Sequence, residues 1–376
     1  MRWQGILAVA TVLLTACGQP AQGRTATATR TESSPSPQSE TSSGTGTAPP
    51  AHCPATQSVG GVTASSNLVV VWLKGGQCFV VRDITDILHP RIIAASTDFR
   101  SPQFVSATEL SYQNGQLFRM QLPGLQRVPL RGGNPYAWGP DGASLAYMGG
   151  TPEAGVQQLH IVSGGQDRIA DPSVPALRGG IGCESRSGCG ETWDVRMLYS
   201  PNGAYISLNY VPGIGVFRIW TADGKVLKSL DSGSATMSVW SGDALYWRDD
   251  KGVQKWQAGQ QSLLLPGVAW VRPRASPAGG LIVYGTRDAG GVAHVLLLDT
   301  TSGKARELKS SRSEPAFLNA HLIWYKEERP CRSGDGWPCG TESTVASGKT
   351  FIYDLQDNTE TESVIDYVFD VWPHPA

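Results

Sequence analysis

Trp138-Gly-Pro-Asp-Gly-Ala-Ser-Leu-Ala-Tyr147 is the stretch that decides the fold, because it joins an aromatic residue, a tight turn and a short apolar strand. A close copy follows as Tyr199-Ser-Pro-Asn-Gly-Ala-Tyr-Ile-Ser-Leu208. Pro-Asp-Gly and Pro-Asn-Gly are strong turn sequences, since proline presets φ and glycine accepts a positive φ. Each copy therefore predicts a β-hairpin whose first strand ends at an aromatic side chain.

Weaker copies of this unit recur along the chain. Their turn-preceding positions are Phe104, Trp240, Ala275 and Phe317, with Trp372 as a last partial copy. The intervals are roughly 35–60 residues, against about 40 for a four-stranded propeller blade. A further β run and tight turn follow the clearer units, and the folded region shows no helical period. The pattern predicts an all-β fold made of repeated four-stranded sheets.

The two ends of the repeat region supply one strand each. Asn67-Leu-Val-Val-Val-Trp72 is a second strand with no first strand before it, and Val368-Phe-Asp-Val-Trp372 is a first strand without a blade of its own. Pairing them would close the ring and leave few exposed sheet edges. We therefore expect residues 53–376 to form a seven-bladed β-propeller closed by the C-terminal strand, with six or eight blades as the alternatives.

The repeat resembles that of TolB-type propellers, whose core is an aromatic residue and Ser-Pro-Asp-Gly followed by a strand. The units at Trp138 and Tyr199 match it well, whereas the other units within residues 67–372 have lost the Pro-Asp-Gly core. The resemblance implies the fold and no particular partner. TolB proteins also carry a separate N-terminal domain, which the low-complexity sequence of this chain does not match.

The N-terminus is typical of an export signal. Arg2 precedes the apolar run 6–14, which is too short to span a bilayer as a stable helix. Leu14-Thr-Ala-Cys17 ends the run and resembles a bacterial lipobox. The resemblance implies that residues 1–16 are a cleaved signal peptide and that Cys17 becomes a lipidated N-terminus. The alternative is an ordinary secretory signal with a chance cysteine.

A multiply acylated Cys17 would anchor the chain well, since each buried CH₂ of a palmitate or similar chain contributes about 0.8 kcal/mol. Residues 18–52 contain no Leu, Ile, Val, Met or aromatic residue. Such a segment buries too little apolar surface to offset its conformational entropy. We therefore expect residues 17–52 to be a disordered linker that holds the propeller on the extracytoplasmic side of the cell membrane.

Six cysteines remain beside Cys17, an even number that favours disulfides in an exported chain. Proximity favours Cys183–Cys189 and Cys331–Cys339, which leaves Cys53 and Cys78 as a third pair. The alternative is a metal site, but these spacings lack the two-residue separation of most zinc sites and no histidine lies beside them. We expect no metal and no cofactor.

Several function classes lack their signatures. The net charge is -1 and no run of Lys or Arg is present, which argues against nucleic acid as a partner. No Gly-x-Ser-x-Gly nucleophile turn is present, and Ser347-Gly-Lys-Thr350 lacks the first glycine of a phosphate loop. The histidines do not fall together in the repeat. We therefore identify no catalytic residue and expect no enzyme.

Long loops on a rigid scaffold commonly carry function. The turns that follow the first and third strands of each blade share one face and are short, as at 140–142. Long connections at 149–157, 171–192 and 326–349 share the other face and include both close cysteine pairs. Trp and Arg are common anchors of interfaces. The candidate binding residues are Arg186, Glu191, Trp193, Arg329, Arg332, Asp335 and Trp337. The alternative is that these loops only cover the end of the ring.

The sequence thus predicts a membrane-anchored lipoprotein of the cell envelope whose propeller binds a protein or peptide, or scaffolds an assembly, without catalysis. The alternative is an enzyme or sugar-binding protein that acts on envelope glycan or peptide in the central funnel.

Overall fold

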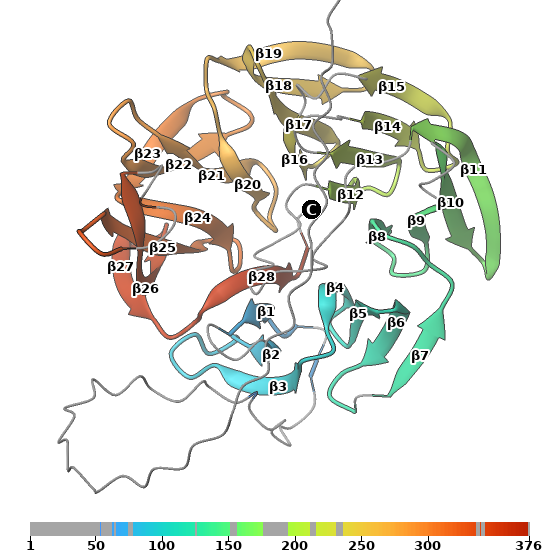
Figure 1. Ribbon diagram of the computed structural model, residues 1–376, viewed down its shortest axis with the longest axis horizontal. Helices are drawn as coiled ribbons and strands as arrows, with labels where there is room; N and C mark the ends of the chain where they lie inside the picture. Colours follow the sequence, from blue (N-terminus) through green and yellow to red (C-terminus); the bar gives the residue numbers. More distant parts are fainter. Residues whose placement is uncertain are drawn as a thin grey trace, which may run out of the picture. The chain divides into compact units, whose positions relative to one another are not determined.

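The computed structural model describes residues 53, 62–63, 65–73, 78–124, 126–150, 156–175, 195–210, 216–230, 236–335, 339 and 343–374. The strands β1–β28 form seven four-stranded antiparallel sheets around a common axis (Figure 1). This is a seven-bladed β-propeller, as the repeat predicts. The described part contains no helix that could cross a membrane.

In every blade the strands follow one another from the axis outward in chain order, except that β28 takes the innermost place in blade 1. Blade 1 is β28 (Tyr367–Trp372), β1 (Leu68–Trp72), β2 (Phe79–Asp83) and β3 (Arg91–Ser96), and blade 2 is β4 (Arg100–Ser106), β5 (Glu109–Asn114), β6 (Gln116–Gln121) and β7 (Arg127–Leu130). Blade 3 is β8 (Tyr136–Trp138), β9 (Leu145–Gly149), β10 (Val156–Ser163) and β11 (Gln166–Pro175), and blade 4 is β12 (Val195–Tyr199), β13 (Tyr205–Tyr210), β14 (Phe217–Thr221) and β15 (Val226–Leu230). Blade 5 is β16 (Thr236–Ser241), β17 (Ala244–Asp249), β18 (Gly252–Gln257) and β19 (Gln260–Pro266), and blade 6 is β20 (Val271–Ala275), β21 (Leu281–Arg287), β22 (Ala293–Asp299) and β23 (Ala305–Ser310). Blade 7 is β24 (Arg312–Phe317), β25 (Leu322–Pro330), β26 (Thr344–Asp354) and β27 (Thr359–Ser363).

The ring is closed by the two ends of the repeat region. Strand β28 pairs antiparallel with β1, with Leu68 opposite Trp372 and Val70 opposite Asp370. The side chains of Leu68 and Val70 are fully buried. The predicted closing pair is therefore confirmed, and blade 1 is assembled from both ends of the chain.

The turn-preceding aromatic residues pack one blade against the next. Trp138 Nε1 donates a hydrogen bond to Ser111 Oγ of blade 2 at 2.8 Å, and Trp240 Nε1 donates to Ser207 Oγ of blade 4 at 2.9 Å. Both serines are fully buried on the second strand of the preceding blade. The packing of the indole ring and the hydrogen bond from its N–H therefore depend on the same contact between blades, which explains why Trp recurs at this position.

The two faces of the ring differ less than the sequence predicts. The turn face carries the short connections after the first and third strands of each blade, such as the turn at Gly142, whose φ of 65° favours glycine. The loop face carries the other connections. Blade 7 has the expected long loop there, but Gly115 alone joins β5 to β6 and only 250–251 join β17 to β18. Long loops are therefore confined to some blades.

Candidate functional site

A cavity of about 270 Å³ lies on the axis of the propeller. It is lined by residues of all seven innermost strands, β4, β8, β12, β16, β20, β24 and β28. At the turn face the lining ends at Pro140, Pro201 and Pro277, each in a turn that follows an innermost strand. The cavity thus belongs to the whole ring and forms only when the ring is closed.

The cavity has an aromatic wall to which four blades contribute. It consists of Trp138, Tyr199, Trp240 and Phe317, which are the turn-preceding aromatic residues of four blades. Trp240 and Phe317 are buried, whereas Trp138 and Tyr199 are half-buried and keep surface toward the cavity. The positions that pack the blades together therefore also supply apolar surface for a ligand.

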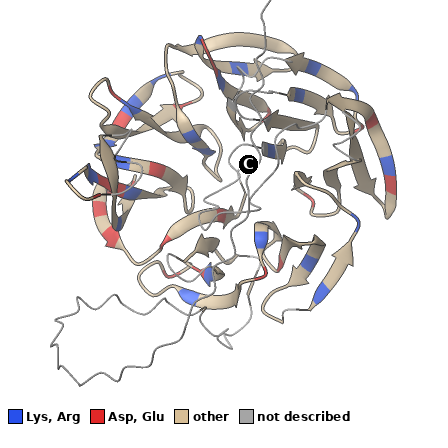
Figure 2. Cartoon of the chain, in the orientation of Figure 1, with Lys and Arg blue, Asp and Glu red and all other residues tan. Residues whose placement is uncertain are grey.

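The charged groups of the cavity come from three separate blades. Arg196 lies on β12, Arg274 on β20 and Asp370 on the closing strand β28, and all three are partly exposed. Asp370 Oδ2 accepts the Phe104 backbone N–H at 2.8 Å and lies 3.4 Å from His374 Nε2. Over the ring as a whole, basic and acidic residues are interspersed (Figure 2). The cavity therefore concentrates two guanidinium groups in mainly apolar surroundings.

Tyr136 stabilises the cavity wall near the loop face. Its hydroxyl donates to the Ser101 carbonyl at 2.7 Å, and burial raises the pKa of Tyr136, so that the phenol stays neutral. Ser101 has a φ of 47°, and Met237, Arg272 and Glu314 have similar values on three other innermost strands. Each of these residues lies at a register shift in its strand pairing. These bulges change which side chains of the strand face the axis.

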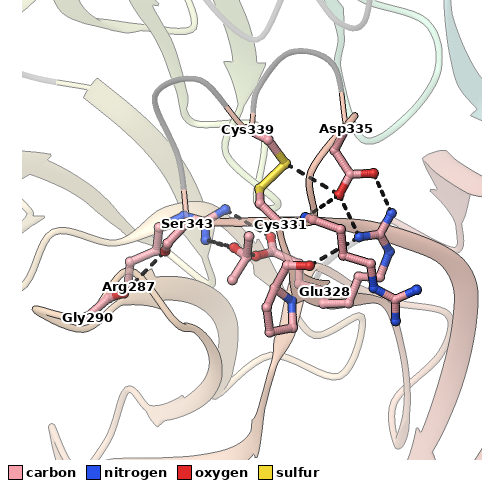
Figure 3. Close-up of a disulfide and its surroundings, with 11 residues drawn as sticks. Arg287, Gly290, Glu328, Cys331, Asp335, Cys339 and Ser343 are labelled. Carbon is pink, nitrogen blue, oxygen red and sulfur yellow. Dashed lines mark hydrogen bonds and ion pairs between the residues drawn. A yellow bond between two sulfur atoms is a disulfide. The ribbon is translucent and has the colours of Figure 1, made fainter.

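On the loop face, a disulfide-linked hairpin extends between β25 and β26 (Figure 3). Cys331 and Cys339 form the disulfide. Arg329 makes a bidentate pair with Asp335 at 2.7 and 2.8 Å, and Asp335 also accepts the Arg332 backbone N–H. These hydrogen bonds hold the pKa of Asp335 well below its usual range. Two of the candidate binding residues, Arg329 and Asp335, therefore bind each other.

The base of this hairpin is attached to blade 6. Glu328 is buried and accepts two hydrogen bonds from Arg287 at 2.8 and 2.9 Å, and Thr344 completes the cluster. Ser343 Oγ donates to the Gly290 carbonyl at 3.2 Å (Figure 3). Burial raises the pKa of Glu328, but the bonds from Arg287 and Thr344 outweigh it and lower that pKa overall. The charges near the hairpin base thus hold the loop in place.

The other predicted site residues have different outcomes. Arg332 is exposed at the hairpin tip. Cys53 and Cys78 are free thiols whose side chains hydrogen-bond in the structure, so their disulfide stays a prediction. Further predicted residues lie outside the described part: Cys17, Arg186, Glu191, Trp193, Trp337, Cys183 and Cys189, together with the signal peptide and the linker. Of the candidate binding residues, the described part of the chain therefore places Arg329, Arg332 and Asp335.

The described histidines are spread over the blades. His160 contacts Asp167 and Tyr147 on blade 3, and His294 lies between Glu307 and Asp288 on blade 6. Within the described ranges, no group of three or more His, Cys, Asp or Glu side chains is placed to hold a metal ion. His374 differs from these because it lies at the axial cavity.

Four cavity residues were not predicted from the sequence: Arg196, Arg274, Asp370 and His374. A signal was present, since the first three are charged positions inside short innermost strands that are otherwise mostly apolar. A charge on a strand beside the axis of a propeller is costly unless it meets a partner or a ligand. Reading the innermost strands for charge would have identified them.

Comparison with known proteins finds similar solved structures only. No protein-family model matches the chain, and no curated protein matches it. An oligogalacturonate lyase from Vibrio parahaemolyticus is 11% identical, with a TM-score of 0.44 over 69% of this chain and 88% of that chain. A putative TolB from Agrobacterium tumefaciens is 16% identical, with a TM-score of 0.42 over 65% and 89%. The β-propeller domain of the Trilobed protease from Pyrococcus furiosus is 10% identical, with a TM-score of 0.43 over 80% and 84%. The assignment of the propeller rests on the strand pairing, and these similarities carry no argument about function.

Proposed function

We propose that the chain is a lipid-anchored protein of the extracytoplasmic membrane surface whose propeller binds a peptide or protein segment without catalysis. The observation that carries the proposal is the axial cavity, which combines an aromatic wall with a few polar groups. Enclosed apolar pockets with a small number of directed polar side chains are typical of binding sites. The N-terminal sequence supports the anchor through Cys17.

We propose the axial cavity, and not the loop face, as the binding site. On the loop face, Arg329, Asp335 and Glu328 are engaged in contacts that hold the hairpin. In the cavity, Trp138 and Tyr199 keep surface toward the enclosed space. An aromatic surface that faces a cavity gains more from a ligand than paired charges do, because burial of apolar area favours binding.

A second candidate function is catalysis on glycan or peptide in the same cavity. The observation that favours it is the contact between His374 and Asp370, which places an acid–base pair at the cavity. Against it, Asp370 Oδ2 already accepts the Phe104 N–H, and Asp370 lies on the strand that closes the ring. Both features give this carboxylate a structural role, so we favour binding without catalysis.

Site-specific photocrosslinking in intact cells would test the proposal. A benzophenone side chain would replace Tyr199 at the cavity, exposed Ser333 at the hairpin tip, or exposed Val226 on outer strand β15 as the control. We expect one defined crosslinked peptide or protein segment from position 199 and none from position 226. Crosslinks from position 333 alone would return the site to the loop face, and none from either would contradict a binding role.

A further inference from the structure

We infer that the axial cavity selects a peptide segment carrying a carboxylate next to an apolar side chain, an inference that rests on the binding function proposed above. The carboxylate would be bound by Arg196 and Arg274, and the apolar side chain would pack on the aromatic wall at Trp138 and Tyr199.

The lining of the cavity contains three charged side chains. These are Arg196, Arg274 and the carboxylate of Asp370. That carboxylate is occupied by the backbone N–H of Phe104. Arg196 and Arg274 come from blades 4 and 6, and Val239 and Trp240 of blade 5 also line the cavity. The two arginines therefore come from the blades on either side of an apolar part of the lining.

The guanidinium group of arginine is well suited to bind a carboxylate. Arg196 and Arg274 each make an interaction within the chain. A guanidinium carries five N–H donors in a planar fork, so it can bond to a group of its own chain and to a ligand at the same time. The fork matches the two oxygens of a carboxylate, and such pairs are among the stronger hydrogen bonds in proteins. A carboxylate is therefore the group that these two side chains fit best.

Apolar side chains surround the two arginines in the cavity. Charge interactions strengthen where water is displaced by apolar groups, because the effective dielectric constant falls. The half-buried Trp138 and Tyr199 offer an apolar surface within the same cavity. A ligand with its carboxylate and an aromatic ring close together would use both features at once. The carboxylate can belong to a chain terminus or to an Asp or Glu side chain.

Three matched probes test this inference on the full folded domain: Ac-Ala-Trp-OH, Ac-Ala-Trp-NH₂ and Ac-Asp-Trp-NH₂. They share the indole and differ in whether and where a carboxylate is present. By titration calorimetry we expect at least one acidic probe to bind about tenfold or more tightly than the neutral amide, which corresponds to one charge-assisted pair. Binding of Ac-Ala-Trp-OH alone would assign a chain terminus, and binding of Ac-Asp-Trp-NH₂ a side-chain carboxylate.

Variants connect that preference to the two arginines. Arg196→Gln and Arg274→Gln should each reduce the preference for the acidic probe, and Arg274→Lys should restore part of it, because the positive charge returns. The matched control is Arg306→Gln on the exposed outer strand β23, which should leave binding unchanged. Circular dichroism and thermal melting would confirm that each variant is folded.

Each contrary result has a distinct meaning. Equal affinity for the acidic and neutral probes would overturn the carboxylate preference while leaving peptide binding in place. Binding of none of the probes would count against both the preference and the binding function. A preference that survives both Gln substitutions would show that the carboxylate is recognised elsewhere, and would also overturn this inference.

Discussion

Asp171 is a single carboxylate that joins two blades. It lies on β11 of blade 3, and its Oδ2 accepts hydrogen bonds from Arg218 at 2.7 Å and Trp220 at 2.9 Å, both on β14 of blade 4. Its side chain is 5% exposed and that of Arg218 is 12% exposed. Burial raises the pKa of Asp171, but the hydrogen bonds from Trp220 and Ser173 and the charge of Arg218 outweigh burial and lower it overall.

The substitution Asp171→Asn should lower the free energy of unfolding by about 3 kcal/mol at pH 7, because Arg218 then lacks its counter-charge in a buried site. A carboxyl group whose folded pKa is lowered contributes stability above its unfolded pKa of about 3.9, and that contribution is lost as pH falls through the folded value. The difference between the two proteins should therefore shrink in acid. Urea titrations at pH 7 and pH 3 would measure it.

The control for this experiment is Asp357→Asn, since Asp357 is exposed in the turn between β26 and β27. This change should leave stability within about 0.5 kcal/mol of the original protein. A difference between Asp171→Asn and the original protein that stays the same at both pH values would contradict the electrostatic explanation.

At the scale of elements, β28 contacts other blades in addition to its pairing with β1. Tyr367, its first residue, accepts a hydrogen bond from Arg272 of blade 6 at 3.1 Å. Lys326 Nζ of blade 7 lies over the aromatic ring of Tyr367, 4.0 Å from its centre. Asp370 in its middle binds the Phe104 N–H of blade 2. One strand thus joins blade 1 to three other blades, and it contributes the acidic side of the cavity.

A chain that ends at Asp366 lacks β28 and should unfold at a lower temperature and over a broader range. The loss of β28 exposes the edge of β1, leaves the Phe104 N–H without its acceptor and opens the axial cavity. Differential scanning calorimetry would compare it with a chain that ends at Trp372 and keeps the whole strand. Equal melting curves for the two chains would show that the ring does not depend on this closure.

At the scale of the whole molecule, Cys53 and Cys78 attach the start of the folded domain to blade 1. Both pack in one apolar cluster with Val71 and Val80, and Cys78 is fully buried. Burial and the neighbouring Cys53 thiol raise the pKa of Cys78 to about 12. At neutral pH this thiol is therefore a poor nucleophile, and its oxidation depends on an oxidising compartment.

If the chain is exported as we propose, protein isolated from the cell envelope should carry a Cys53–Cys78 disulfide. In the loop-entropy model this link contributes about 3.5 kcal/mol, which the double variant Cys53→Ser/Cys78→Ser should lose. Peptide mapping without reduction would detect the link, with the Cys331–Cys339 disulfide as the internal reference. Full alkylation of both thiols in the native envelope protein would contradict this pairing.

The fold could be predicted to a large extent because its signals are local. The turn at Gly142 follows from Pro-Asp-Gly, and the hairpin disulfide from the short spacing of Cys331 and Cys339. The pairing of β1 with β28 is distant in sequence, yet two orphan half-blades leave only one partner for each. The choice of site could not be predicted in the same way, since the pairing of Arg329 with Asp335 depends on how the hairpin folds back.

The sequence by itself determined the repeated-blade architecture and the strand that closes it, because turn residues and alternating side chains act over a few neighbours. The count of seven, which the sequence favoured over six or eight, was decided by the strand pairing. Only the tertiary structure decided which charges meet. Arg196, Arg274 and Asp370 lie on three blades, and they line one cavity only because the ring brings their strands to a common axis. The bulge at Arg272, with a φ of 51°, shifts the register just before Arg274. Since a shift of one residue moves a strand's side chains to its other face, the lining of the cavity depends on three-dimensional pairing.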